Sequence, residues 1–135
     1  TFIFENGLEP ADYTFRFGDF TPAEGFQAME EIVRMPAERR PSAIITGSIA
    51  ITAGAMAYCK KHGMSIPGDI AIVSSGTFVY EDIIGAKLTY LDDSAQAMSD
   101  LIVRLIERCL NGEKIPSDYS AVLQPVLHVG ESSGA

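Results

Sequence analysis

The sequence predicts an α/β fold in which a parallel sheet is flanked by helices. Short apolar segments typical of buried strands alternate along the chain with longer segments whose apolar residues recur at helical spacing. Ala43–Ile45 and Ile70–Val73 are two such strands, and the second is the continuous apolar run expected of a strand covered on both faces. Alternation of this kind favours parallel strands joined by helical crossovers. The 135 residues suffice for one domain.

Local signals set the bounds of the predicted helices. Thr21-Pro22-Ala23-Glu24 combines a capping box with proline at the first helical position, and Ser48 is a suitable N-cap. Glycine is the usual residue just beyond a helix, which predicts a stop at Gly63. The predicted helices are Thr21 to Met35, Ser48 to Gly63, and Ser94 to Asn111.

Further strands are predicted from period-two alternation and from apolar runs, at Tyr13–Phe17, Lys87–Leu91 and Ala121–Val129. The chain begins at Thr1 in the middle of a pattern, without a signal peptide, which predicts a fragment of a longer domain. Ser42–Cys59 carries no charge, but small residues and Gly47 interrupt it. We interpret it as a buried strand and helix rather than a membrane span.

Composition and motifs argue against several classes of function. The 10 Lys and Arg residues against 18 Asp and Glu give a net charge of −8, so this chain should not bind nucleic acid by itself. No catalytic, phosphate-binding or metal-binding motif is present, so we predict no enzyme, no catalytic residues, no cofactor and no metal. Cys59 and Cys109 are predicted to be reduced thiols in or near the core.

Several segments, in order, resemble the effector-binding domain of the LacI/GalR repressor family. Gly63-Met64-Ser65-Ile66-Pro67-Gly68-Asp69-Ile70 with the strand after it is the best match. Gly18-Asp19-Phe20-Thr21 is similar to the family's strand-to-helix junction, and Pro41–Met56 to a strand and small-residue helix. Leu88-Thr89 and the closing Leu127–Ser132 also fit.

The resemblance implies a periplasmic-binding-protein-like type I domain of two subdomains that closes on a small effector. It implies residues 1–92 and about 122–133 as part of the second subdomain, and residues 93–121 as a crossover segment of the first. A central strand between Tyr13–Phe17 and Ala43–Thr46 would then be missing. The implied protein is a cytoplasmic homodimer that contacts operator DNA only through an N-terminal headpiece absent here. A periplasmic solute-binding protein of a sugar ABC transporter is the alternative.

Ligands of open α/β sheets bind beyond the carboxyl ends of the strands. That position, together with the resemblance, predicts effector contacts at Phe20, Ser48, Ile49, Gly76 and Asp93. Sugar-binding relatives carry Asn-Asp where this chain has Ser48-Ile49, and Asp-Asp where it has Gly76-Thr77. We therefore expect apolar contacts to outweigh hydrogen bonds, since the usual hydroxyl partners are lost.

A homodimer interface is predicted on the helix Ala50–Lys60 and the loop Phe78–Ile84. The helix presents small residues that allow another backbone to approach, and the loop places large apolar groups in an irregular segment. The interface residues predicted are Ala53, Ala57, Phe78, Tyr80, Ile83 and Ile84. The stripe of Ala95, Met98, Ile102, Leu105 and Cys109 needs a cover, predicted to come from a second chain or a rearranged packing.

Overall fold

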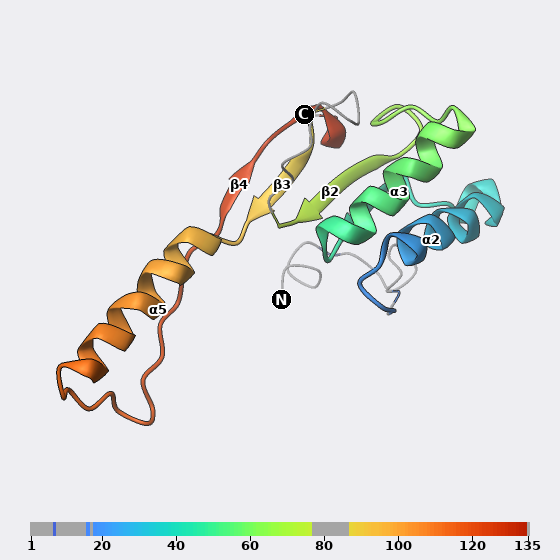
Figure 1. The fold of residues 1–135 in the computed structure, drawn as a ribbon. Coiled ribbons are helices and arrows are strands. Elements are labelled where there is room, and N and C mark those ends of the chain that lie inside the picture. Colours follow the sequence, from blue (N-terminus) through green and yellow to red (C-terminus); the bar gives the residue numbers. More distant parts are fainter. Residues whose placement is uncertain (1–6, 8–15, 17, 77–86, 135) are drawn as a thin grey trace.

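The computed structural model describes residues 7, 16, 18–76 and 87–134 (Figure 1). The predicted strand at residues 13–17 lies outside the described residues except for residue 16, and the predicted interface loop at 78–84 lies outside them entirely. The absence of a central strand beside residues 13–17 therefore stays a prediction. In chain order the described elements are α2 (Pro22–Arg34), η1 (Ala37–Arg39), β1 (Ala43–Thr46), α3 (Ile49–His62), β2 (Ala71–Ser75), β3 (Thr89–Asp92), α5 (Ala95–Leu110), β4 (Val126–His128) and η2 (Glu131–Ser133).

The strands form one sheet in the order β1-β2-β3-β4. β1 pairs with β2, and β2 with β3, in parallel, as the sequence predicts. The last strand differs from the prediction in two respects: it covers only three residues, and it runs antiparallel to β3. Figure 1 shows the reason, because α5 leads away from the sheet and the chain returns beside it in the opposite direction, without a crossover.

The starts of α2 and α3 and the end of α3 are those that the capping signals predict. The Thr21 hydroxyl accepts a hydrogen bond from the amide of Glu24 at 3.3 Å, and the Ser48 hydroxyl accepts one from the amide of Ile51 at 3.3 Å. α3 ends at Gly63, whose φ of 66° is the left-handed conformation that glycine adopts most easily. Local sequence thus fixes where α2 and α3 begin and where α3 ends.

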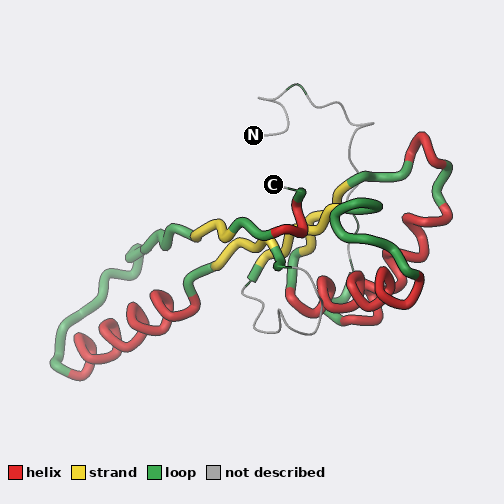
Figure 2. The backbone as a smooth tube through the Cα atoms, turned by 90° about the horizontal axis from the view of Figure 1, so that it is seen from above, coloured by secondary structure: helices red, strands yellow, loops and turns green. Residues whose placement is uncertain are grey.

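α2 and α3 lie on the same face of the sheet (Figures 1 and 2), and the core forms between them and β2. Two glycines let the helices touch. A Cβ on Gly25 would stand 2.0 Å from the carbonyl oxygen of Ile51, and one on Gly54 would stand 1.8 Å from that of Pro22. The buried core residues are Met29, Ala55, Met56, Tyr58, Cys59, Ile70, Ile72 and Leu88.

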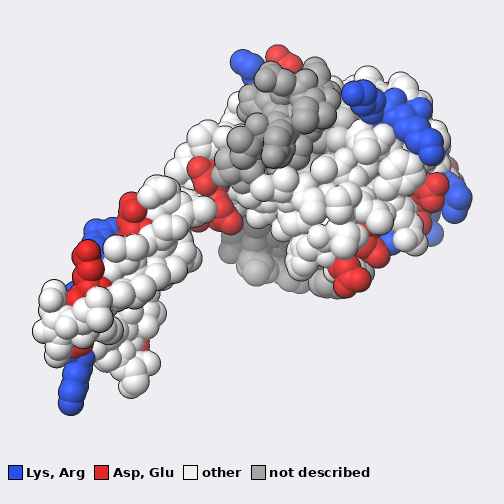
Figure 3. Space-filling model, viewed as in Figure 1, with Lys and Arg blue, Asp and Glu red and all other residues white. Residues whose placement is uncertain are grey.

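We call α5 and the segment that returns from it, residues 95–125, the arm. In Figures 1 and 2 the arm projects from the end of the sheet, and α5 has no buried residue. Its apolar stripe is uncovered by the described residues, with Met98 and Ile102 47% and 48% exposed. Uncharged residues make up most of the face of the arm that is visible in Figure 3. Assignment of this segment to another subdomain stays a prediction.

Both cysteines are free, but only Cys59 lies in the core. Cys109 is exposed, contrary to the expectation of a core or near-core thiol, because it sits on the uncovered arm. Burial raises the pKa of the Cys59 thiol above its ordinary value. None of the described helices is long and apolar enough to cross a membrane.

Candidate functional site

The carboxyl ends of β1 and β2 bring two predicted site segments to one edge of the sheet. In the parallel pairing Thr46 lies opposite Ser74, so the residues that follow each strand leave the sheet at the same end. Ser48 and Ile49 follow β1, and Gly76 follows β2. This is the edge at which open α/β sheets bind their ligands.

Phe20 lies beside this edge, just before α2. A Cβ placed on Gly47 would stand 3.6 Å from Cε1 of Phe20, so the ring lies against the turn between β1 and α3. Phe20 is 69% exposed, which leaves most of the ring free to meet a ligand. Ser48 is half-buried, and its hydroxyl already caps α3. Phe20 therefore offers an apolar surface beside the Ser48 hydroxyl, which already accepts a hydrogen bond from the amide of Ile51.

Ile49 and Gly76 meet across the ends of the two strands. Gly76 has a φ of 94°, and a Cβ there would stand 3.3 Å from Cγ1 of Ile49. The Gly76 amide donates a hydrogen bond to the carbonyl oxygen of Leu91 at 2.9 Å, which holds the turn against β3. Backbone conformation and Ile49 thus both disfavour a side chain at position 76. We call Phe20, Ser48, Ile49 and Gly76 the strand-end site.

Asp93, the fifth predicted contact, follows β3 at the same edge of the sheet but is not joined to the strand-end site. It is exposed and makes no hydrogen bond or ion pair among the described residues. The next residue, Ser94, has a left-handed φ of 57°, and its amide donates to Oδ1 of Asp92 at 2.9 Å. Asp92 also lies 3.8 Å from Nε2 of His128 in β4.

Sequence reasoning missed a group of buried hydroxyls beneath the strand-end site. Thr46, Thr52 and Ser74 are 5%, 0% and 0% exposed, and hydrogen bonds of 2.6 and 2.7 Å join them through Thr52. The sequence did contain a signal, because β1, β2 and α3 each carry a Thr or Ser at a position that faces the core. Buried polar groups need partners, so three of them in neighbouring elements indicate a shared network.

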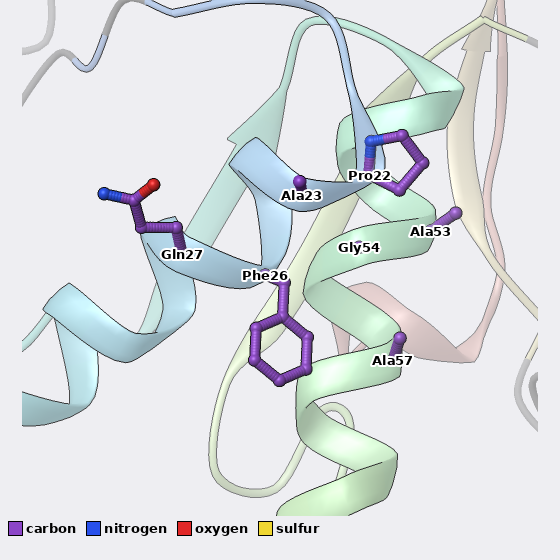
Figure 4. Close-up of a pocket in the computed structure, with 7 residues that line it drawn as sticks. All are labelled: Pro22, Ala23, Phe26, Gln27, Ala53, Gly54 and Ala57. Carbon is purple, nitrogen blue, oxygen red and sulfur yellow. The ribbon is translucent and has the colours of Figure 1, made fainter.

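A second surface lies on the outer side of the helix pair. α2 and α3 form an open groove of about 440 Å³ lined by Pro22, Ala23, Phe26, Gln27, Ala53, Gly54 and Ala57. Ala53 and Ala57, two of the predicted interface residues, point to the same side of α3 (Figure 4). Phe26 packs edge-on against Tyr58 at 5.0 Å between ring centroids, so one wall of the groove is aromatic. The other four predicted interface residues lie outside the described residues.

The chain matches a known protein family over nearly its whole length. A model of the periplasmic binding protein-like domain matches residues 2–133. The chain belongs to this family. Among curated relatives of this periplasmic binding protein-like domain, the HTH-type transcriptional repressor PurR of Escherichia coli O139:H28 is 25% identical over 105 residues. That match covers 73% of this chain and 29% of the repressor.

Solved structures agree on the fold. Transcription regulator CcpA of Lactococcus lactis has a TM-score of 0.81 at 16% identity, over 97% of this chain and 46% of that one. A LacI family transcriptional regulator from Lactobacillus casei, solved with bound sucrose, has a TM-score of 0.75 at 19% identity, over 97% of this chain and 47% of that one. The predicted fold class and the resemblance to LacI/GalR effector-binding domains are confirmed, and a transporter's solute-binding protein is not favoured.

Proposed function

We propose that this periplasmic binding protein-like domain is the ligand-sensing and dimerisation module of a cytoplasmic bacterial transcription regulator. The family match and the repressor among its relatives support the proposal. Because the relative named above is an HTH-type repressor, we infer that operator DNA is contacted through such a domain outside these 135 residues. A net charge of −8 opposes binding of phosphate backbones by the module itself. The module has no catalytic role.

The strand-end site carries this proposal, and Asp93, which follows β3 at the same edge of the sheet, is a further proposed contact. Phe20 exposes most of its ring, Ile49 lies against Gly76, and the Ser48 hydroxyl already accepts a hydrogen bond from Ile51. A ligand held here meets an aromatic ring and an aliphatic side chain, with few uncommitted polar groups. We infer a small effector with a substantial apolar or aromatic face, bound more by surface burial than by hydrogen bonds.

Titration calorimetry with a panel of aromatic carboxylates, nucleobases and unmodified hexoses tests the site. Phe20→Ala should weaken binding of the compound found by about tenfold or more, because about 1.5–3 kcal/mol of apolar burial is lost. Leu110→Ala is the matched control, since it removes an 81% exposed apolar side chain from the arm. Tight binding of an unmodified hexose through these positions would contradict the inferred class of ligand.

The dimer interface is proposed on the α2–α3 groove and the segment at 78–84, including Ala53, Ala57, Phe78, Tyr80, Ile83 and Ile84. Small residues on α3 allow a partner backbone to approach the groove closely. Sedimentation of the full-length regulator at micromolar concentration should show that Tyr80→Asp with Ile83→Asp, and separately Ala57→Glu, weaken association. A charged variant that associates with undiminished affinity would rule this interface out.

A further inference from the structure

Thr52 stands at the centre of the buried hydroxyl network beneath the strand-end site. Its Oγ1 lies 2.6 Å from Oγ1 of Thr46 and 2.7 Å from Oγ of Ser74. The same atom lies 2.8 Å from the carbonyl oxygen of Ser48. One side chain on the first turn of α3 therefore contacts the ends of two strands and the cap of its own helix.

The protons of the network can be assigned from the partners. The carbonyl oxygen of Ser48 can only accept, so the single hydroxyl proton of Thr52 is donated to it. Thr46 and Ser74 then each donate to Thr52, which accepts two hydrogen bonds, the number its lone pairs allow. The other acceptors within reach, the carbonyl oxygens of Val73 and Ser75, stand at the longer distance of 3.3 Å.

Each group bound to Thr52 either belongs to the strand-end site or lies two residues from it in sequence. Ser48 belongs to the site and precedes Ile49, Ser74 lies two residues before Gly76, and Thr46 ends β1. We propose that Thr52 is a positioning residue that holds Ile49 against Gly76 without itself touching the effector. The inference rests on the proposed function, because it concerns the geometry of that site.

The chain offers variants that separate the hydroxyl from the shape of the side chain. Thr52→Val keeps the branched shape and removes the oxygen, so Thr46 and Ser74 lose their closest acceptor. Thr52→Ser keeps the oxygen and removes a methyl group. Ser99→Ala is the control, since Ser99 makes the same bond from a helical hydroxyl to the carbonyl four residues earlier, at 2.9 Å on exposed α5.

Amide hydrogen exchange measured by NMR on the unliganded protein tests the proposal. The reporters are the amides of Ile51, bonded to the Ser48 hydroxyl, and of Gly76, bonded to Leu91. The reference is the amide of Met64, bonded to Cys59 at the far end of α3 at 2.9 Å. Local loosening near Thr52 accelerates exchange of the two reporter amides alone. A general loss of stability accelerates exchange of the reference amide as well.

In Thr52→Val we expect Ile51 and Gly76 to exchange about tenfold faster or more relative to Met64, corresponding to about 1.4 kcal/mol of local opening. Thr52→Ser should restore the wild-type ratio, and Ser99→Ala should leave it unchanged. An unchanged ratio in Thr52→Val overturns the proposal. Because no effector is used, a calorimetric screen that finds no ligand contradicts the proposed function and leaves this result standing.

Discussion

At the scale of single residues, the contact between α2 and α3 depends on two positions that carry no side chain. Gly25 and Gly54 each face a backbone carbonyl at a distance that no Cβ can occupy, 2.0 and 1.8 Å. A backbone carbonyl cannot move aside as the end of a flexible side chain can. The two helices would therefore have to separate to admit even a methyl group.

Gly54→Ala should destabilise the protein by about 1–3 kcal/mol through overpacking at this contact. Gly47→Ala is the matched control, because its Cβ would meet Phe20 at 3.6 Å, an ordinary contact distance. Urea unfolding followed by circular dichroism measures both variants. Equal stability of the two would show that the helices do not meet as closely as described.

Asp69 provides a pH-dependent contact at the turn before β2. Hydrogen bonds from the amide and then the hydroxyl of Ser65, at 2.7 and 2.9 Å, lower the pKa of the Asp69 carboxyl below its ordinary value of 3.8. A lowered pKa in the folded state stabilises the fold above the ordinary value, and this contribution is lost as the pH falls through the folded pKa.

Asp69→Asn should therefore lower the unfolding midpoint near neutral pH and have a shrinking effect as the pH falls below 3.8. The measurement is the urea midpoint of both proteins from about pH 7 to about pH 3. A constant difference across this range would mean that the charge of Asp69 contributes nothing.

At the scale of elements, local signals predicted more than long-range arrangement. The caps at Thr21 and Ser48 and the stop at Gly63 act within a few residues, so their outcome can be deduced from the sequence. The direction of β4 depends on the course of the whole arm, which no short pattern contains. The resemblance and the parallel-strand rule placed Ile49 near Gly76, while their contact through a positive φ at Gly76 needed coordinates.

The hydroxyl network couples β1, β2 and α3, which predicts non-additive effects of mutation. Thr52→Val alone should cost about 1–3 kcal/mol, because the buried hydroxyls of Thr46 and Ser74 lose their closest acceptor and keep only carbonyl oxygens at 3.3 Å. The triple variant Thr46→Val, Thr52→Val and Ser74→Ala should be at least as stable as Thr52→Val, since no orphaned hydroxyl remains. Denaturant unfolding of single and triple variants measures the difference, and strictly additive losses would contradict a coupled network.

At the scale of the whole molecule, the arm exposes a large apolar surface that the rest of the described chain does not cover. Its exposed large apolar residues are Met98, Ile102, Val103, Ile106, Leu110, Tyr119 and Val122. Contiguous apolar surface of this kind is rare on an isolated monomer and common at contacts with another chain or domain. We therefore expect this chain, studied alone, to associate through the arm.

The double variant Ile102→Asp, Ile106→Asp should reduce association of the 135-residue chain at micromolar concentration. Ile102 and Ile106 are 48% and 53% exposed, so the two new charges would lie on the exposed apolar side of α5. Analytical ultracentrifugation provides the mass, and exchange protection of α5 amides identifies the covered element. Arg104→Asp, on the same helix, is the charge control. A monomer whose α5 amides exchange freely would contradict the expectation of a cover.

The left-handed φ of Ser94 has a mechanical consequence for the arm. Among the described residues it is the one non-glycine position with a positive φ, and it lies where β3 passes into α5. A helix of 16 residues is about 24 Å long. Rotation of about 10° at its base therefore displaces its tip by about 4 Å. A small change in one torsion angle at Ser94 would therefore become a larger displacement at the far end of α5.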